Sequence, residues 1–251
     1  MSKILPKHAQ IVIVGGGIMG CSTAYHLISN GCKDVILLER SKLTSGTTWH
    51  SAAQVRQLRS NESLTKIVKN SVELYSSLEE KTGQATGWQQ TGSISIATNK
   101  DRLTHIQRQA SLSKTFGIIA EEINLKEVSE KWPLIRTDDV LGTVFSPSDG
   151  RVSPSDICAA LVKSARSNGL RVFEDTPVTE ILSKNGRVNG LKTNQSEIYC
   201  DTIVNCAGLW GRKIADMAGV SAPLHACEHF YLLTEEIEAI KGPLPTLSDH
   251  D

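Results

Sequence analysis

The stretch "AQIVIVGGGIMGCSTAYHLISNG" (residues 9–31) and the stretch "DVILLE" (34–39) that follows it decide the fold. Residues 9–14 are apolar and rich in β-branched side chains, which is typical of a strand buried on both faces. After the glycines, the apolar positions from Cys21 to Ile28 have helical spacing, and Gly31 is a typical helix stop. Residues 34–39 are expected to form a second buried strand. The order of these segments predicts a βαβ unit.

Three glycines between the first strand and the helix have the spacing of a dinucleotide-binding loop. Gly15 permits the turn, Gly17 lets the backbone approach a pyrophosphate, and Gly20 lets the helix pack on the strand. The N-terminal amides of the helix are then available to the phosphates. Glu39 ends the second strand, where its carboxylate is suited to a ribose hydroxyl, and Arg40 is interpreted as a surface or adenine-side residue. This pattern argues against a 2′-phosphate but leaves NAD and FAD open.

The rest of the chain predicts further α/β structure. Amphipathic helices are expected over residues 64–78, 101–116 and 153–169. Strands are expected at 92–98, 171–173, 178–182, 188–192 and 202–206. Because the βαβ unit and the late strands fit one nucleotide-binding sheet, residues 86–145 are interpreted as an insertion.

Composition excludes several function classes. The chain has 251 residues, with 27 basic and 27 acidic side chains, so its charge favours neither nucleic acid nor an anionic membrane. Its six cysteines include no CxxC pair, which argues against a disulfide framework or metal site and for a reducing compartment. No targeting segment and no long apolar run is recognisable, so the sequence predicts a cytoplasmic protein without membrane spans.

The loop "SGTTWHSAAQ" (residues 45–54) has neither helical nor strand periodicity. Its small residues would let the chain lie close against a ligand, with Trp49 and His50 next to each other. From the residues alone, a solvated loop histidine is the better interpretation of His50.

Five segments in this order resemble one family: "IVIVGGGIMGCSTAYHLISNG", "LTSGTTWHSA", "LYSSLEEKTGQATGWQQTGSISIAT", "DGRVSPSDICAAL" and "TIVNCAGLWG". The family is the FAD-dependent amine oxidoreductases of the D-amino-acid-oxidase and glycine-oxidase type, and the branch is that of dimethylglycine and sarcosine dehydrogenases. The resemblance runs from about residue 9 to about residue 235. It implies FAD rather than NAD, bound covalently from His50 to the 8α carbon of the flavin, with Trp49 shielding one side of the bond.

The resemblance also implies the FAD contacts, residue by residue. They are Gly15, Gly17, Ile18, Met19 and Gly20 at the phosphates, Glu39 and Arg40 at the ribose and adenine, Gly46, Thr47, Thr48, Trp49, His50, Ser51, Ala52, Ala53 and Gln54 along the flavin, Val178 at the adenine through its backbone, and Ala207, Gly208 and Trp210 after the last strand. By side chain alone, core packing is an equally good interpretation of Val178.

The implied fold is α/β, with a discontinuous Rossmann-like FAD-binding domain and an inserted, mostly antiparallel substrate domain. Residues 1–85 and 146–220 are assigned to the FAD-binding domain, and residues 86–145 and 221–251 to the substrate domain. Because the chain stops at "PTLSDHD", inside the second of these substrate segments, we expect it to be an N-terminal fragment.

The resemblance implies oxidative N-demethylation of a secondary or tertiary N-methyl amine, such as sarcosine or dimethylglycine, by hydride transfer to flavin. The resulting iminium is hydrolysed to formaldehyde, or trapped by tetrahydrofolate in a C-terminal portion missing from this chain. Electron-transfer flavoprotein and O2 are the two expected acceptors. The expected location is the cytoplasm, or the mitochondrial matrix in a eukaryote.

The stretch "HACEHFYLL" (225–233) supplies candidates for accepting the amine proton. If it is a strand, His229 and Tyr231 lie on one face, and the resemblance places a histidine and a tyrosine there. A plain edge strand is an equally good interpretation. Arg56 and Arg59 are weaker candidates for binding a substrate carboxylate, and a solvated helix start explains them better.

Two other functions are compatible with parts of the sequence. One is a non-catalytic regulatory homologue, of which the pyruvate dehydrogenase phosphatase regulatory subunit is an example, although His50 favours an enzyme. The other is an NAD-dependent dehydrogenase, which needs neither the loop at 45–54 nor the "VNCAGLW" segment. The chain departs from the dimethylglycine dehydrogenase pattern after the loop histidine, because Gln54 and Arg56 stand where that branch continues with a glycine. This is nearer to sarcosine dehydrogenases, so the departure affects the expected substrate and not the expected flavin.

Overall fold

The computed structural model describes residues 4–59 and 61–249, which form two compact units. The first unit comprises the chain up to Ala52, with Leu78–Thr86 and Pro154–His229. The second comprises Ala53–Ser77, Gly87–Ser153 and the chain from Phe230. Among the described residues, no helix combines the length and the apolar character that crossing a membrane requires.

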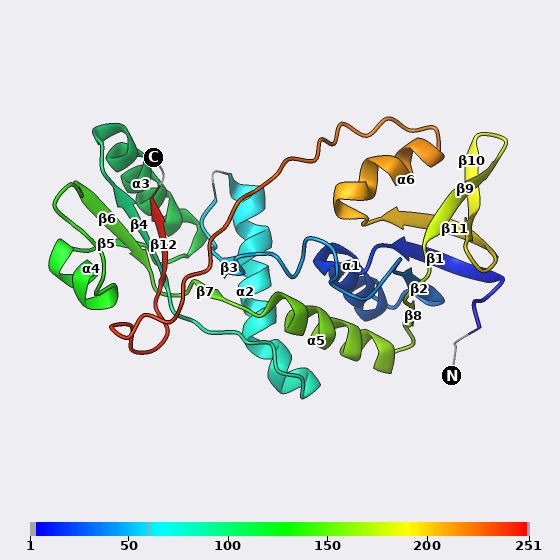
Figure 1. Ribbon diagram of the computed structural model, residues 1–251, viewed down its shortest axis with the longest axis horizontal. Coiled ribbons are helices and arrows are strands. Elements are labelled where there is room, and N and C mark those ends of the chain that lie inside the picture. The colour runs from blue at the N-terminus through cyan, green and yellow to red at the C-terminus, as the bar shows by residue number, and fades with distance from the viewer. Residues whose placement is uncertain (1–3, 60, 250–251) are drawn as a thin grey trace. The chain divides into compact units, whose positions relative to one another are not determined.

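The first unit is built on a six-stranded sheet with the order β8-β2-β1-β11-β10-β9 (Figure 1). Strands β8, β2, β1 and β11 are parallel neighbours, whereas β10 and β9 continue the sheet antiparallel. Their bounds are β1 His8–Val14, β2 Val35–Leu38, β8 Arg171–Phe173, β9 Val178–Lys184, β10 Arg187–Thr193 and β11 Glu197–Asn205. The predicted βαβ unit is thus confirmed, and the early and late strands do join one sheet.

Helices cover both faces of this sheet (Figure 1). Helix α1 (Ile18–Ser29) packs beside α5 (Pro154–Ser167) on one face, and the short α6 (Gly211–Met217) lies on the other. All four residues of β2 are buried, as its continuous apolar sequence predicts. The core is formed by apolar side chains from both the early and the late strands, among them Val12, Ile36, Leu38, Leu191 and Ile198.

The second unit contains a four-stranded sheet with the order β12-β4-β6-β5. Neighbours β4, β6 and β5 are antiparallel, and β12 joins β4 in parallel. A separate pair is formed by β3 and β7. The bounds are β3 Gln54–Val55, β4 Ser93–Ala97, β5 Glu121–Glu122, β6 Gly142–Ser146, β7 Gly150–Arg151, β12 Thr246–Asp249, α3 Lys100–Ser113, a 3₁₀ helix Lys114–Phe116 and α4 Leu125–Lys131. Helix α2 (Glu62–Thr82) has residues in both units.

The strand that would align His229 and Tyr231 is not formed. Residues 225–233 have no regular secondary structure, and Phe230 is 85% exposed. Alternation of apolar and polar residues describes how a strand would present its faces, but a strand forms only where a neighbouring backbone completes its hydrogen bonds. The argument that His229 and Tyr231 share a strand face therefore fails.

Candidate dinucleotide site

Each of the three fingerprint glycines in the loop between β1 and α1 is required for a different physical reason. Gly15 has a positive φ of 113°, and a Cβ there would lie 2.4 Å from the Cys206 carbonyl oxygen. A Cβ on Gly20 would lie 1.8 Å from the Gly15 carbonyl oxygen, so α1 approaches β1 as closely as the fingerprint predicts. Gly17 has an ordinary φ of −79°, but a Cβ there would lie 2.8 Å from Thr48 Oγ1.

Glu39 fixes the position of this loop at the end of β2. Its carboxylate is buried, with Oε2 accepting from the Gly16 amide at 2.7 Å and Oε1 accepting from the Ser41 amide at 2.9 Å. A carboxylate has about four acceptor sites, so these two bonds leave capacity for ribose hydroxyls. Glu39 therefore has a structural task in addition to the predicted ligand contact.

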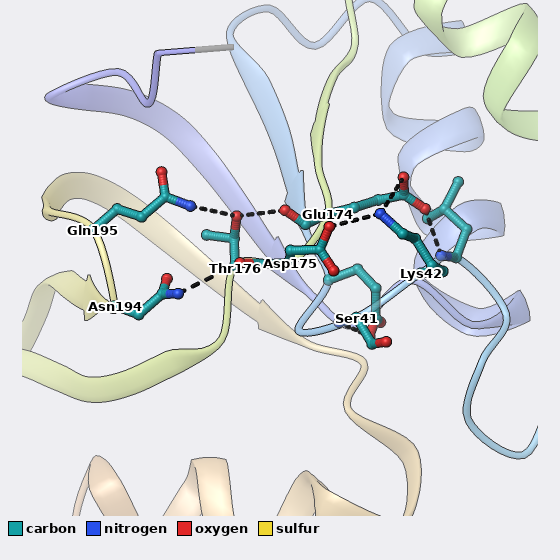
Figure 2. Close-up of polar contacts among 9 residues, drawn as sticks. Ser41, Lys42, Glu174, Asp175, Thr176, Asn194 and Gln195 are labelled. Atoms are coloured by element: carbon teal, nitrogen blue, oxygen red, sulfur yellow. Dashed lines mark hydrogen bonds and ion pairs between the residues drawn. The ribbon is translucent and has the colours of Figure 1, made fainter. Parts of the chain in front are cut away.

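A polar network joins the segment after β2 to the segment before β9 (Figure 2). Backbone bonds run from Asp175 to the Ser41 carbonyl at 2.9 Å and from Thr176 to the Glu39 carbonyl at 2.8 Å. Lys42 and Asp175 form an exposed ion pair at 2.6 Å, which raises the pKa of Lys42. Because this ion pair is exposed to solvent, it contributes little to stability, so the backbone bonds and the buried Thr176 determine the geometry.

A second layer of this network reaches the turn between β10 and β11. The Thr176 hydroxyl donates to the Glu174 carbonyl at 2.8 Å and lies 3.5 Å from Gln195 Nε2, as Figure 2 shows. Residues 176–178 are thereby held in place just before the exposed part of β9. Sequence reasoning identified Val178 but not the threonine that positions it.

A cavity of about 270 Å³ lies at the carboxyl ends of β1, β2 and β11, within the first unit. Open parallel sheets bind their ligands at this edge. The lining of the cavity includes eleven of the predicted FAD contacts: Gly15, Gly17, Glu39, Arg40, Gly46, Thr47, Thr48, Val178, Ala207, Gly208 and Trp210. Nine further lining residues were missed: Val14, Gly16, Leu38, Thr176, Pro177, Cys206, Lys213, Ile214 and Met217.

The remaining predicted contacts lie elsewhere. Ile18, Met19, Gly20, Trp49, His50, Ser51 and Ala52 belong to the first unit but do not line the cavity, and Ala53 and Gln54 belong to the second unit. The Met19 side chain is 67% exposed, so only its backbone is suited to a phosphate contact. Among the missed residues, Val14, Gly16 and Cys206 lie inside the quoted motifs, whereas Lys213, Ile214 and Met217 on α6 carry no motif and follow the 3₁₀ helix Gly208–Trp210 in the chain.

Trp210 brings two predicted segments together at the cavity wall. The Arg40 guanidinium carbon lies 3.5 Å from the centroid of the Trp210 ring, which is a cation–π contact. A Cβ on Gly46 would lie 3.4 Å from the same indole, which is ordinary van der Waals distance, so Gly46 lies directly beside the ring. Arg40 thus borders the cavity and contacts an aromatic ring there, and its role at the adenine end of FAD stays a prediction.

The Trp–His loop (residues 45–52) consists of turns, as its lack of periodicity predicts. Thr48 is 7% exposed, whereas Trp49 is 54% exposed and His50 is also at the surface. The rings of Trp49 and His50 lie 3.7 Å apart between centroids with planes tilted by 34°. The loop therefore presents an indole and an imidazole in close, tilted contact at the surface.

The second unit contains an arginine that the sequence placed wrongly. Arg56 is not at a solvated helix start: it is half-buried and donates to Ser95 Oγ at 2.6 Å and to Ser248 Oγ. Its burial lowers the pKa of the guanidinium, and the charge of Asp149 opposes that shift. Arg59 is exposed, in agreement with the solvated interpretation.

The family model for FAD-dependent oxidoreductases, DAO, matches residues 10–251. The chain belongs to this family. FAD is therefore the cofactor that the cavity must fit, and its residues do fit: the glycine loop leaves backbone space, Glu39 has acceptor capacity, and the cavity lies at the strand ends. The predicted family and α/β fold are confirmed.

Relatives of known name match over the whole chain. The chain is 40% identical to human mitochondrial sarcosine dehydrogenase over 256 residues and 41% identical to the mouse mitochondrial pyruvate dehydrogenase phosphatase regulatory subunit over 253 residues. It spans only 28% and 29% of these proteins. The crystal structure of L-proline dehydrogenase from P. horikoshii matches 86% of this chain and 57% of that one, with 29% identity and a TM-score of 0.81.

Proposed function

We propose that this chain is the flavin-binding part of an enzyme that oxidises secondary or tertiary N-methyl amines such as sarcosine or dimethylglycine. The observation that carries the proposal is the cavity at the strand ends, bordered by the glycine loop, Glu39 and the Trp–His loop. The likeness to human sarcosine dehydrogenase, at 40% identity over the whole chain, supports the amine as substrate.

In this proposal the phosphates of FAD lie at the glycine loop and the N-terminus of α1, because free helix amides and the helix dipole favour anions. Glu39 accepts from the ribose, and Arg40, Trp210 and Val178 border the nucleotide. When bound, FAD would supply the hydride acceptor for oxidation of the N-methyl carbon of the amine. The product iminium is hydrolysed to formaldehyde and the demethylated amine, and electron-transfer flavoprotein or O2 takes the electrons.

The substrate must react as the free base, since a protonated nitrogen has no lone pair to assist hydride loss. We retain His229 and Tyr231 as proposed proton acceptors on the resemblance alone, because the strand that would align them is not formed. Replacing each by an isosteric residue, His229→Gln and Tyr231→Phe, should shift the pH profile of kcat/KM toward higher pH. An unchanged profile in both variants would remove them from the proposal.

We also propose that FAD is bound covalently through His50. One imidazole nitrogen forms a bond to the 8α carbon of the flavin, and the imidazole N–H and the methyl group each lose one hydrogen. Formation of this bond would leave two electrons, which the flavin ring would accept and dioxygen would then take up to give hydrogen peroxide. A neutral imidazole is a competent nucleophile, and His50 follows shortly after Gly46, Thr47 and Thr48, the part of the same loop that lines the cavity.

The test is to express the whole gene product, precipitate it in acid and measure yellow colour in the pellet. His50→Ala should move the flavin to the supernatant, whereas His105→Ala, on α3 of the second unit, should leave it in the pellet. Colourless pellets from the unmodified protein would overturn the covalent bond but not FAD binding. Turnover is tested with sarcosine, dimethylglycine and longer N-methyl amines by formaldehyde release, with O2 or electron-transfer flavoprotein as acceptor.

The regulatory function is the second candidate, because the mouse regulatory subunit is 41% identical over the whole chain. A protein that holds FAD but oxidises none of the amines would favour it. The mitochondrial names of both relatives support a matrix location if the source is eukaryotic, and localisation of a tagged gene product tests this. A tetrahydrofolate step is proposed only for a longer gene product.

A further inference from the structure

Thr48 connects the Trp–His loop to the dinucleotide helix. Its side chain is 7% exposed, and its Oγ1 accepts a hydrogen bond from the Ile18 amide at 3.0 Å. Gly17, the N-cap residue of α1, offers no side chain of its own to cap that amide. Thr48 therefore caps α1 from a distant point in the sequence, where a serine or threonine normally acts from the N-cap position.

The space for this contact depends on Gly17. A Cβ on Gly17 would lie 2.8 Å from Thr48 Oγ1, which is shorter than a carbon and an oxygen tolerate. The close approach is thus available only because the second glycine of the fingerprint has no side chain. The Trp–His loop and the N-terminus of α1 therefore contact each other through Thr48 Oγ1, in the space that Gly17 leaves open.

The backbone of Thr48 also closes the turn that carries His50. The Ser51 amide donates to the Thr48 carbonyl at 3.2 Å, which makes Thr48 the first residue of a four-residue turn with Trp49 and His50 in the middle. One residue is therefore fixed on two sides, by its hydroxyl to α1 and by its carbonyl to the turn.

We propose that Thr48 is the positioning residue for covalent attachment of the flavin to His50. This rests on the proposed function, in which the phosphates of FAD bind at the N-terminus of α1. The Thr48 hydroxyl ties the turn to that same helix end, so the cofactor and His50 share one reference point. Holding two reacting groups in a fixed relation accelerates bond formation, even when neither is chemically altered.

The decisive variant is Thr48→Val, which keeps the shape of the side chain and removes the hydroxyl. Apoprotein of the whole gene product is mixed with FAD, and acid-stable flavin is measured over time. We expect attachment to slow by roughly tenfold, which corresponds to the loss of one buried hydrogen bond. Thr48→Ser keeps the oxygen and should restore most of the rate, and Thr104→Val, the same change at an exposed site on α3, should have no effect.

The affinity for FAD before attachment gives a readout that separates positioning from general damage. It is measured by flavin fluorescence in the His50→Ala background, with and without Thr48→Val, and the attachment rates are then compared at FAD concentrations that saturate each variant, so that weaker binding is not counted as slower attachment. If Thr48→Val does not fold, Thr48→Ala takes its place with the same expected result. Attachment at the normal rate in the folded variant, or equally slow attachment in Thr48→Ser, would overturn the proposal.

The two proposals fail in different ways. Acid-stable flavin in His50→Ala would sink the covalent site itself, whatever Thr48 does. Loss of acid-stable flavin in His50→Ala with normal attachment in Thr48→Val would leave the covalent site standing and remove only the role of Thr48.

Discussion

The carboxylate of Glu39 should stabilise the protein even before FAD binds, and Glu39→Gln tests this. The glutamate accepts from two backbone amides, Gly16 at 2.7 Å and Ser41 at 2.9 Å, in a buried position. A glutamine has only one oxygen for these two donors, and its NH₂ group would face the other amide. Since hydrogen bonds to charged groups contribute about 1.5–3 kcal/mol, we expect the apoprotein to lose about 2 kcal/mol of its free energy of unfolding.

The assay is thermal unfolding of the apoprotein, followed by circular dichroism. For a chain of this size, about 2 kcal/mol lowers the Tm by roughly 4–8 °C. Glu80→Gln, at an exposed position of α2 in the same unit, is the matched control and should leave the Tm unchanged. FAD should then bind more weakly to Glu39→Gln, because the glycine loop is no longer fixed. If the Glu39→Gln apoprotein had the Tm of the unmodified apoprotein, the stabilising role of Glu39 would be refuted, even if FAD binding were lost.

Three other predictions concern the first unit. Arg40→Ala removes the cation–π contact with Trp210, worth about 0.5–1 kcal/mol at an exposed site, and should weaken FAD binding two- to fivefold by fluorescence titration. Gly20→Ala should prevent soluble expression or FAD binding, because its Cβ would lie 1.8 Å from a backbone oxygen of the glycine loop. Burial raises the pKa of Cys200 to about 11, so its thiol should resist DTNB at pH 8 while the exposed Cys227 reacts. Stability should fall as the pH rises from 9 to 11, where the thiol ionises only in the unfolded chain, and Cys200→Ala should flatten that slope.

Much of the first unit could be predicted from the sequence because its signals are local. The apolar run of β1, the glycine spacing and the acid at the end of β2 each depend on neighbours within one βαβ unit. The sequence also indicated that early and late strands share one sheet, and the structure places β1 between β2 and β11. Turns and strand ends shifted by only a few residues, as for β11, which begins at Glu197 instead of 202.

The contacts that the sequence did not indicate are between segments far apart in the chain. Thr176 is held by the Glu39 carbonyl, and Arg40 lies over Trp210, yet neither pair is marked by any spacing rule. Arg56 was misplaced for the same reason, since its hydrogen-bond partners Ser95 and Ser248 come from two other strands. The periodicity of apolar residues indicates which face of a helix or strand is buried, but it does not indicate which residues that face contacts.

The likeness to a dehydrogenase and to a regulatory subunit is nearly equal, at 40% and 41% identity, so overall similarity does not decide between them. A cavity for FAD is compatible with both, because holding a dinucleotide requires the glycine loop, Glu39 and the strand ends alone. A covalent bond at His50 is different, because it secures a cofactor that already binds through its phosphates. Such a bond has a physical purpose when the flavin must stay in one position through repeated reduction and reoxidation. Covalent flavin in this protein would therefore favour the enzyme over the regulator, and bleaching of that flavin by an N-methyl amine without oxygen would complete the case.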